Sequence, residues 1–451
     1  MNRCKVLIAA IAALCLGAGD PENSPFAARR AAVMKKIGRG AALLAGAPET
    51  RAYVPFRQDN DFYYLTGVEA PGSFLLIDGG ARRSVLFLPP RSLPVEQWEG
   101  ARLYAGEEAR RLTGIEEVLE VSKLEEELRR RSAASTELFV RRLAEETAAA
   151  SRDRAYQYDV AQEANPWDGR VSRERALETS LKRRLGDGVR LADLSPVLDE
   201  LRRVKDAAEI ARMREASRIA AAGLRAAIGA AQPGQFEYQL AALAGLVFRW
   251  NGAPGDSYFP LVGSGPNSCI VHYHDNSRRL EAGDIVVMDY GPDYRYYQAD
   301  VTRTFPVSAS FTDEQRRIYR IVLEAQNAAL AQVRPGATFR ELNRAARDVI
   351  ERAGYGKYWL HGVSHYIGMS THDVGEPVAF EPGVVVTVEP GIYIAEKNLG
   401  VRIEDTVLVT QNGHESLSRD VPREIDEIEK LRKSGASDPG LPFRLALPGL
   451  R

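Results

Sequence analysis

The sequence contains few cysteines, and their positions limit what they can do. Only three of the 451 residues are cysteine, and Cys4 and Cys15 lie close to the N-terminus. If that segment is removed, Cys269 stands alone and no intrachain disulfide can form. Its neighbours Ile270 and Val271 favour a small buried hydrophobic residue over a nucleophile.

The sequence also lacks an excess of charge of either sign. It has 60 Lys and Arg against 61 Asp and Glu, a formal net charge of -1, with 45% apolar residues. This balance gives no electrostatic basis for binding nucleic acid. It is typical of a soluble globular protein. A chain of 451 residues exceeds what one hydrophobic core usually holds, so we expect two domains.

No apolar run after residue 16 is long enough to span a membrane, which takes roughly 20 residues. The run Val6–Leu16 follows Arg3 and Lys5 and precedes the small residues Gly17-Ala18-Gly19. This pattern predicts a signal peptide over residues 1–19. We therefore expect an exported protein, periplasmic or secreted, with no stable membrane anchor after cleavage.

The pattern of apolar residues changes along the chain. In residues 24–195, short apolar runs such as 73–78 alternate with Arg/Glu-rich amphipathic segments, which predicts an α/β domain. Residues 196–433 predict an α+β domain in which each half has two helices and a set of antiparallel strands. One helix is expected to start near Asp206, and its counterpart at Thr312, with Gln315 closing a capping box. Residues 434–451 are rich in Gly and Pro and form a tail of unassigned order.

Histidine and acidic residues are concentrated in the second of these regions. Asp289 and Glu389 each end an apolar, strand-like run. Strands are depleted in Asp and Glu, and a buried ionised carboxylate is costly unless it is paired or bound to a metal. Five of the six histidines lie in the same 101-residue window: His272, His274, His361, His365 and His372. The combination predicts a metal site.

The same region contains an internal repeat. Residues 272–291 align with residues 372–391 at a constant offset of one hundred, without a gap. This predicts two duplicated units around a pseudo-twofold axis, with the site between them. His365 has no counterpart, because Gly265 stands at the equivalent position. The aligned pairs are His272 with His372, Asp289 with Glu389, and, farther on, Asp300 with Glu404 and Thr302 with Thr406.

Local spacing suggests how the carboxylates meet. A turn at Gly291-Pro292-Asp293 would bring Asp289 and Asp300 to one end of the sheet. Strand alternation puts Arg402 and Glu404 on one face, where the guanidinium could steady the carboxylate. One imidazole with four carboxylates favours Mn²⁺, Co²⁺, Fe²⁺ or Zn²⁺. Four negative charges favour two such ions.

Four segments of the second domain resemble motifs of the Xaa-Pro aminopeptidases (aminopeptidase P), which are pita-bread metallopeptidases of family M24. They are residues 361–365, 371–375, 388–393 and 402–405. Residues 60–67 are similar to a segment of that family's creatinase-like N-terminal domain. The resemblance implies an α+β fold with a two-halved pita-bread catalytic domain over 196–433. It also implies an aminopeptidase P-like, creatinase-like α/β domain over 24–195.

The resemblance implies an enzyme that hydrolyses the bond between an N-terminal residue and a following proline. Its cofactors would be two divalent ions, normally Mn²⁺. Asp289 would chelate one ion, His365 and Glu389 the other, and Asp300 and Glu404 would bridge them. A metal-bridging hydroxide would attack the carbonyl, with Glu389 as general base and then acid.

The remaining roles also follow from the resemblance. His372 would polarise the carbonyl oxygen, His272 would contact the prolyl side, and His361 would be a further catalytic histidine. Partners would be peptides with proline in second position, and the protein would be a homodimer or homotetramer. We assign no role to His274 or His414. Candidate substrate-binding or supporting residues are Tyr258, Tyr393, Arg402 and Asp61.

Three other functions are compatible with parts of this pattern. A prolidase, which cleaves Xaa-Pro dipeptides, uses the same five ligands, but Ser364 and Tyr366 around His365 favour the aminopeptidase. A non-catalytic binding protein on the pita-bread fold is disfavoured because no ligand is missing. A creatinase-like hydrolase is disfavoured because that branch lacks the full carboxylate set.

Overall fold

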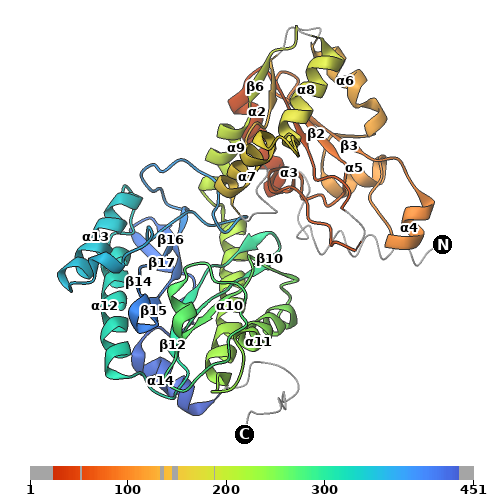
Figure 1. Ribbon diagram of the computed structural model, residues 1–451. Helices are drawn as coiled ribbons and strands as arrows, with labels where there is room; N and C mark the ends of the chain where they lie inside the picture. Colours follow the sequence, from red (N-terminus) through yellow and green to blue (C-terminus); the bar gives the residue numbers. More distant parts are fainter. Residues whose placement is uncertain (1–23, 51–52, 133–136, 145–150, 187, 436–451) are drawn as a thin grey trace. The chain divides into compact units, whose positions relative to one another are not determined.

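The structure is a computed structural model that describes residues 24–50, 53–132, 137–144, 151–186 and 188–435 (Figure 1). The chain divides into two compact units, Met1–Leu201 and Arg202–Arg451. The division lies slightly after the boundary expected at residue 195. The expected signal segment 1–19 lies outside the described residues, as does the expected tail apart from Ser434 and Gly435. Ser434 belongs to the last helix and not to the tail.

The first unit is built on one mixed sheet of six strands, in the order β4-β3-β2-β1-β5-β6. β1 pairs antiparallel with β2 and parallel with β5, which gives the sheet its mixed character. This confirms the expected α/β domain. The strands are β1 (Ala41–Ala45), β2 (Phe74–Asp78), β3 (Arg83–Leu88), β4 (Glu117–Glu120), β5 (Leu138–Val140) and β6 (Leu191–Asp193).

Apolar residues from strands and helices form the core of the first unit. Leu43, Leu76 and Val85 of the sheet pack with Leu128 of α6 and Leu181 of α8. α9 carries the chain into the second unit. The helices are α2 (Pro25–Ile37), α3 (Asn60–Thr66), α4 (Leu93–Glu99), α5 (Glu107–Thr113), α6 (Leu124–Ser132), α7 (Arg152–Ala164), α8 (Arg173–Leu185) and α9 (Ser195–Arg203), with a 3₁₀ turn η2 (Val121–Lys123).

The second unit has two halves, each with a pair of helices. The first pair is α10 (Ala207–Ala230) and α11 (Glu237–Trp250), and the second is α12 (Asp313–Leu330) and α13 (Phe339–Arg352). The pairs flank the strands of the unit on opposite sides (Figure 1). Thr312 caps α12 with the predicted capping box, and α10 begins after Asp206 as expected, where the structure shows a second capping box that the sequence analysis did not predict.

The strands of each half are antiparallel and short. Leu224, Val286, Ile318 and Val386 belong to one buried apolar cluster, so both halves share a core. In the first half lie β7 (Gly255–Asp256), β8 (Leu261–Ser264), β9 (Ile285–Asp289), β10 (Pro292–Tyr294), β11 (Tyr297–Gln298) and β12 (Thr302–Pro306); in the second β13 (Val385–Val388), β14 (Gly391–Ile394), β15 (Leu399–Arg402), β16 (Asp405–Thr410) and β17 (Gly413–Ser416). The remaining elements are the 3₁₀ turns η4 (Gly265–Cys269), η5 (Gly356–Tyr358) and η6 (Ala395–Lys397) and the last helix α14 (Ile425–Ser434).

The two halves repeat each other in backbone detail. Gly234 N–H donates to Leu280 O at 2.8 Å, and Gly336 N–H donates to Phe380 O at the same distance. In both halves the glycine that precedes the central strand has a left-handed backbone, with φ of +94° at Gly283 and +95° in its counterpart Gly383. The duplication predicted from the sequence is therefore present in the fold.

The turn predicted at Gly291-Pro292-Asp293 is wrong. Pro292 and Asp293 lie in β10, and the chain reverses later, at Arg295 and Tyr296, which both have positive φ. Pro292 is acceptable there because it is the first residue of a strand. The chain thus makes an extra short hairpin between β9 and β12 before it returns to Asp300.

Candidate metal centre

The five predicted ligands come from strand ends and from one irregular segment. Asp289 is the last residue of β9, and Glu389 follows the last residue of β13, its equivalent in the repeat. Asp300 precedes β12, and Glu404 lies between β15 and β16. His365 lies on the segment that leads to β13, where its carbonyl accepts from Thr387 N–H at 3.0 Å and its N–H donates to Thr387 Oγ1 at 3.2 Å.

These side chains converge at one place. Potential ligand atoms of Asp300, His365 and Glu404 lie within 4.8 Å of one another. Nε2 of His365 is 3.6 Å from Asp300 Oδ2 and 3.5 Å from Glu389 Oε1. The Tyr258 hydroxyl contacts Asp300 Oδ1 at 2.6 Å and also contacts Asp289 Oδ1. The structure therefore brings all five predicted ligands together.

The contacts of His365 leave one ring nitrogen free to bind a cation. Nδ1 lies 3.0 Å from the carbonyl oxygen of Tyr366. Because a carbonyl only accepts, Nδ1 carries the proton, and the lone pair of Nε2 faces the carboxylates. Burial lowers the pKa of His365 to about 4, so the ring is neutral at pH 7. While both carboxylates are ionised, the lone pair of Nε2 repels them unless a cation, either a proton or a metal ion, lies between them.

The buried carboxylates also lack enough neighbouring positive charge to balance their own negative charges. Burial, together with the negative charge of Asp289, raises the pKa of Asp300 to about 8. Burial also raises the pKa values of Glu389 and Glu404, where Asp300 adds further repulsion. Three buried carboxylates with raised pKa values, next to a neutral imidazole, fit a site for divalent metal. The oxygen-rich donor set suits Mn²⁺, Fe²⁺, Co²⁺ or Zn²⁺.

The guanidinium of Arg402 binds a different carboxylate from the one predicted. Its Nη2 donates to Asp289 Oδ2 at 2.7 Å, and its Nε donates to the Thr302 hydroxyl at 3.0 Å. Strand alternation fails here because β15 ends at Arg402, before Glu404. Arg402 reaches Glu404 through Thr302, whose hydroxyl donates to Glu404 Oε2 at 2.8 Å.

The sequence pairs Thr302 with Thr406 in the repeat but assigns neither a role, and the structure places both against predicted ligands. Each lies two residues after a predicted bridging carboxylate, at equivalent positions of the repeat. Thr406 bonds the backbone of Asp300, and Thr302 bonds the side chain of Glu404. Their equivalent positions in the repeat could have identified them from the sequence.

A second cluster of polar residues lies beside the ligands. Nε2 of His361 is 2.7 Å from the Tyr393 hydroxyl, which accepts a hydrogen bond from Arg402 at 3.0 Å. Nδ1 of His361 is 3.9 Å from Glu389 Oε2. Burial, with help from the charge of Arg402, lowers the pKa of His361 to about 4. Burial raises the pKa of Tyr393 to about 12.

The other four histidines have different surroundings. The ring of His372 stacks on His365, with centroids 4.1 Å apart. His272 is exposed, and the carbonyl before it accepts a hydrogen bond from Arg402 at 3.3 Å. His274 is exposed, and His414 lies on β17 near Val333 O.

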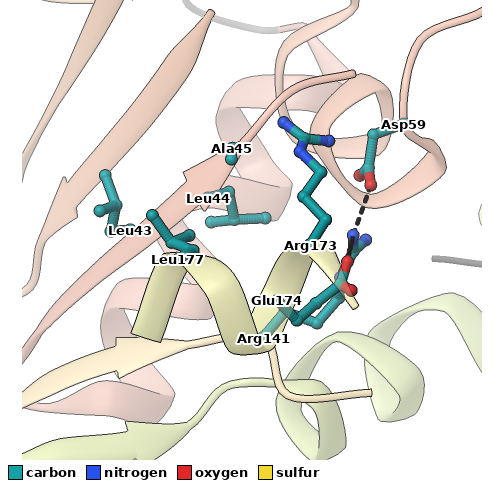
Figure 2. A pocket seen from close by; sticks show the side chains of 8 residues that line it. All are labelled: Leu43, Leu44, Ala45, Asp59, Arg141, Arg173, Glu174 and Leu177. Carbon is teal, nitrogen blue, oxygen red and sulfur yellow. Dashed lines mark hydrogen bonds and ion pairs between the residues drawn. The ribbon is translucent and has the colours of Figure 1, made fainter. Parts of the chain in front are cut away.

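Two residues discussed from the sequence lie elsewhere or differ from expectation. Cys269 is half-buried, at the end of η4, and not fully buried as expected. Asp61 belongs to the first unit, where its buried carboxylate contacts Arg141 at 3.1 Å and Arg152 at 3.3 Å. In the same region Arg141 lies between Asp59 and Glu174, beside a cavity of about 20 Å³ (Figure 2). That volume holds roughly one water molecule and no peptide.

Comparison with known proteins places this geometry in context. The model of metallopeptidase family M24 matches residues 211–411, and the model of the aminopeptidase P N-terminal domain matches residues 26–139. A Xaa-Pro aminopeptidase of Escherichia coli is 33% identical over 445 residues, which cover 90% of this chain and 97% of that protein. A Xaa-Pro dipeptidase of Pyrococcus furiosus is 38% identical over 231 residues, 50% of this chain and 66% of that protein. The solved structure of E. coli aminopeptidase P with the inhibitor Pro-Leu has a TM-score of 0.77 at 31% identity, covering 91% of this chain and 98% of that one.

Proposed function

The chain belongs to the Xaa-Pro aminopeptidases of metallopeptidase family M24, and we propose that it removes the N-terminal residue from peptides whose second residue is proline. It is a peptidase with a centre for divalent metal. The observation that carries the proposal is the convergence of the five predicted ligands at one place, with His361 and His372 beside them.

We propose that the metal is Mn²⁺, bound as a pair, because five hard or borderline donors with four negative charges suit two such ions. Asp289 would hold one ion, His365 and Glu389 the other, and Asp300 and Glu404 both. When bound, such ions lower the pKa of a coordinated water and polarise a carbonyl. Metal analysis of purified protein after dialysis, with Mn²⁺ and Zn²⁺ reloading compared, tests the choice of metal.

Glu389 is the group placed to move the proton. Its Oε1 lies 3.5 Å from His365 Nε2 and its Oε2 lies 3.9 Å from His361 Nδ1, a position inside the site that suits a carboxyl that first accepts a proton and then donates it. Hydrolysis needs both steps, because the attacking water loses a proton and the prolyl nitrogen gains one as the C–N bond breaks. We therefore expect Glu389→Gln to abolish turnover.

His361 and His372 flank the ligands on different sides, and each is suited to hold the substrate. His361 is neutral, with its Nε2 on Tyr393 and its Nδ1 on Gly362 O. His372 presents its ring beside His365. A bond to proline has no N–H, so ordinary strand-like pairing with the substrate is not available there. Side-chain contacts of this kind have to orient the bond instead.

The experiment that tests the function is a peptide panel with Mn²⁺-loaded protein. Arg-Pro-Pro and Gly-Pro-Pro should be cleaved after the first residue, while the dipeptide Gly-Pro should be a poor substrate. Cleavage of Gly-Pro alone would favour a dipeptidase such as the Pyrococcus furiosus protein, which is similar to half of this chain. No cleavage and no bound metal would favour the non-catalytic binding protein.

We also propose export and self-association. Residues 1–19 have the composition of a signal peptide, and no described helix is long and apolar enough to cross a membrane. The resemblance to aminopeptidase P supports a homodimer or homotetramer. N-terminal sequencing of protein from cell fractions tests the first proposal, and sedimentation tests the second. An intact N-terminus in the cytoplasm, or an active monomer, would contradict them.

A further inference from the structure

His372 has a defined place although its segment has little regular structure. Residues 359–384, all described, form no helix and no strand of more than an isolated bridge. Nevertheless the ring of His372 stacks on His365 with an interplanar angle of 28°. Contacts made by neighbouring residues help to hold it there.

The next residue, Asp373, is held by two cations. Arg202 Nη2 lies 2.6 Å from Asp373 Oδ1, and Lys205 Nζ lies 3.1 Å from Asp373 Oδ2. All three side chains are 1% exposed. The backbone N–H of Asp373 also donates to Tyr366 O at 2.9 Å. Because adjacent Cα atoms are about 3.8 Å apart, fixing Asp373 at both backbone and side chain restricts His372.

The two cations are themselves anchored to the strand that leads to Glu389. Lys205 N–H donates to Gly383 O at 2.9 Å, and Val204 forms an antiparallel bridge with Val384. Val384 directly precedes β13, at whose other end Glu389 follows. The pair of ionic contacts between Asp373 and Arg202 and Lys205, called here the Asp373 clamp, thus ties the His372 segment to the strand that positions a metal ligand.

Gly368 shows how closely the clamp packs. A Cβ atom at Gly368 would lie 2.2 Å from Asp373 Oδ2 and 2.8 Å from Lys205 Cε. The carbonyl of Gly368 accepts a hydrogen bond from Gln298 N–H at 2.9 Å, two residues before Asp300. A side chain at residue 368 would push the clamp and the ligand segment apart.

Burial of three ionised groups is an expensive way to stabilise a loop. Removing charges from water is unfavourable, and pairing offsets this only in a good geometry. Apolar residues would pack at less cost. The buried ion pairs of Asp373 therefore favour one position of the His372 segment over others.

We propose that Asp373 is a positioning residue for the peptidase reaction: through the clamp with Arg202 and Lys205 it sets the place of the His372 ring against His365. The expected effect on catalysis rests on the proposed function, in which His372 contacts the substrate. The structural consequence, the position of the ring, does not depend on that function.

The test is a double-mutant cycle between Asp373→Asn and His372→Ala in the Mn²⁺-loaded protein. Asp373→Asn keeps the shape of the side chain but removes its charge. It should lower kcat about 10- to 100-fold, as misplacement by about 1 Å does, with bound metal unchanged. In the His372→Ala background the same change should have almost no further effect, because the group it positions is gone. Equal losses in both backgrounds would overturn the proposal.

A matched control is Glu381→Gln. It removes the partner of Arg203, in the same connecting segment, but Glu381 is 58% exposed and does not touch Asp373. Its kcat should stay that of the wild type. If Asp373→Asn does not fold, Arg202→Lys keeps the charge and should show a smaller kcat loss with the same dependence on His372.

A crystal structure of the metal-loaded Asp373→Asn protein separates this proposal from the proposed function. The inference expects the His372 ring to leave its position 4.1 Å from His365, whatever the substrate is. An undisplaced ring would overturn it even if the wild type cleaves Xaa-Pro peptides. A displaced ring in a protein without that activity would overturn only the function.

Discussion

Thr406 of one half of the second unit holds the backbone of Asp300 of the other half. Asp300 N–H donates to Thr406 Oγ1 at 3.2 Å, and the Thr406 hydroxyl donates back to Asp300 O at 2.8 Å. The equivalent Thr302 donates to Glu404 Oε2, and its own carbonyl accepts from Glu404 N–H at 3.1 Å. Each half thus fixes a predicted metal ligand supplied by the other, Asp300 through its backbone and Glu404 through its backbone and side chain, so the duplicated halves build one site and not two.

Thr302→Val is expected to weaken metal binding about 10- to 100-fold, as removal of groups that orient metal ligands does. The hydroxyl accepts from Arg402 Nε and therefore donates to Glu404. Equilibrium dialysis against Mn²⁺ measures the effect. Thr304→Val is the control, because Thr304 is buried on the same strand but bonds only the backbone of Arg402 in the described contacts. Equal affinities for both variants would contradict the assignment.

Metal binding near neutral pH is expected to release protons. The raised pKa of Asp300, about 8, means that the metal-free site holds a proton below that pH and loses it as pH rises. Bound carboxylates must be ionised, so the apparent affinity should increase between about pH 6 and about pH 8. Calorimetry in two buffers with different ionisation enthalpies measures the released protons. Identical heats in both buffers would contradict this prediction.

Tyr393→Phe is expected to lower kcat without removing the metal. The variant keeps the ring but deletes the hydroxyl that joins Arg402 to His361. A loss of about 10-fold to 100-fold would match the usual effect of a mispositioned catalytic side chain. Steady-state kinetics with a tripeptide substrate, beside metal analysis, measures it. Tyr358→Phe, whose hydroxyl contacts the surface residue Glu396, should behave as the wild type; a loss of metal in Tyr393→Phe would sink the prediction.

Asp405→Asn is expected to destabilise the protein by about 3–5 kcal/mol, because it leaves the fully buried Arg303 guanidinium without its carboxylate partner at 2.8 Å. Glu415→Gln, which breaks the exposed pair with Arg214, should cost about 1 kcal/mol or less. Urea unfolding in the presence of EDTA compares the two without a contribution from metal. Similar midpoints for both variants would show that burial of the pair does not matter.

The sequence by itself determined the elements with strong local causes. The capping boxes at Asp206 and Thr312 satisfy helix ends within four residues of the chain, so they are readable locally. The repeat could be read because duplication preserves spacing, including the left-handed glycines 283 and 383. The conflict between a carboxylate and a buried strand was enough to single out Asp289 and Glu389.

Tertiary structure decided the partners of these residues. Whether Arg402 meets Glu404 or Asp289 depends on where β15 ends and how the halves face each other, and a guanidinium can reach either. The reversal at Arg295 and Tyr296 carries no glycine that would mark it. The clamp on Asp373 joins residues about 170 positions apart in the sequence, and no local pattern records such a pairing. The residue types determine which metal ligands and ion pairs are possible. Only the packing of segments that lie far apart in the sequence determines which of these side chains meet.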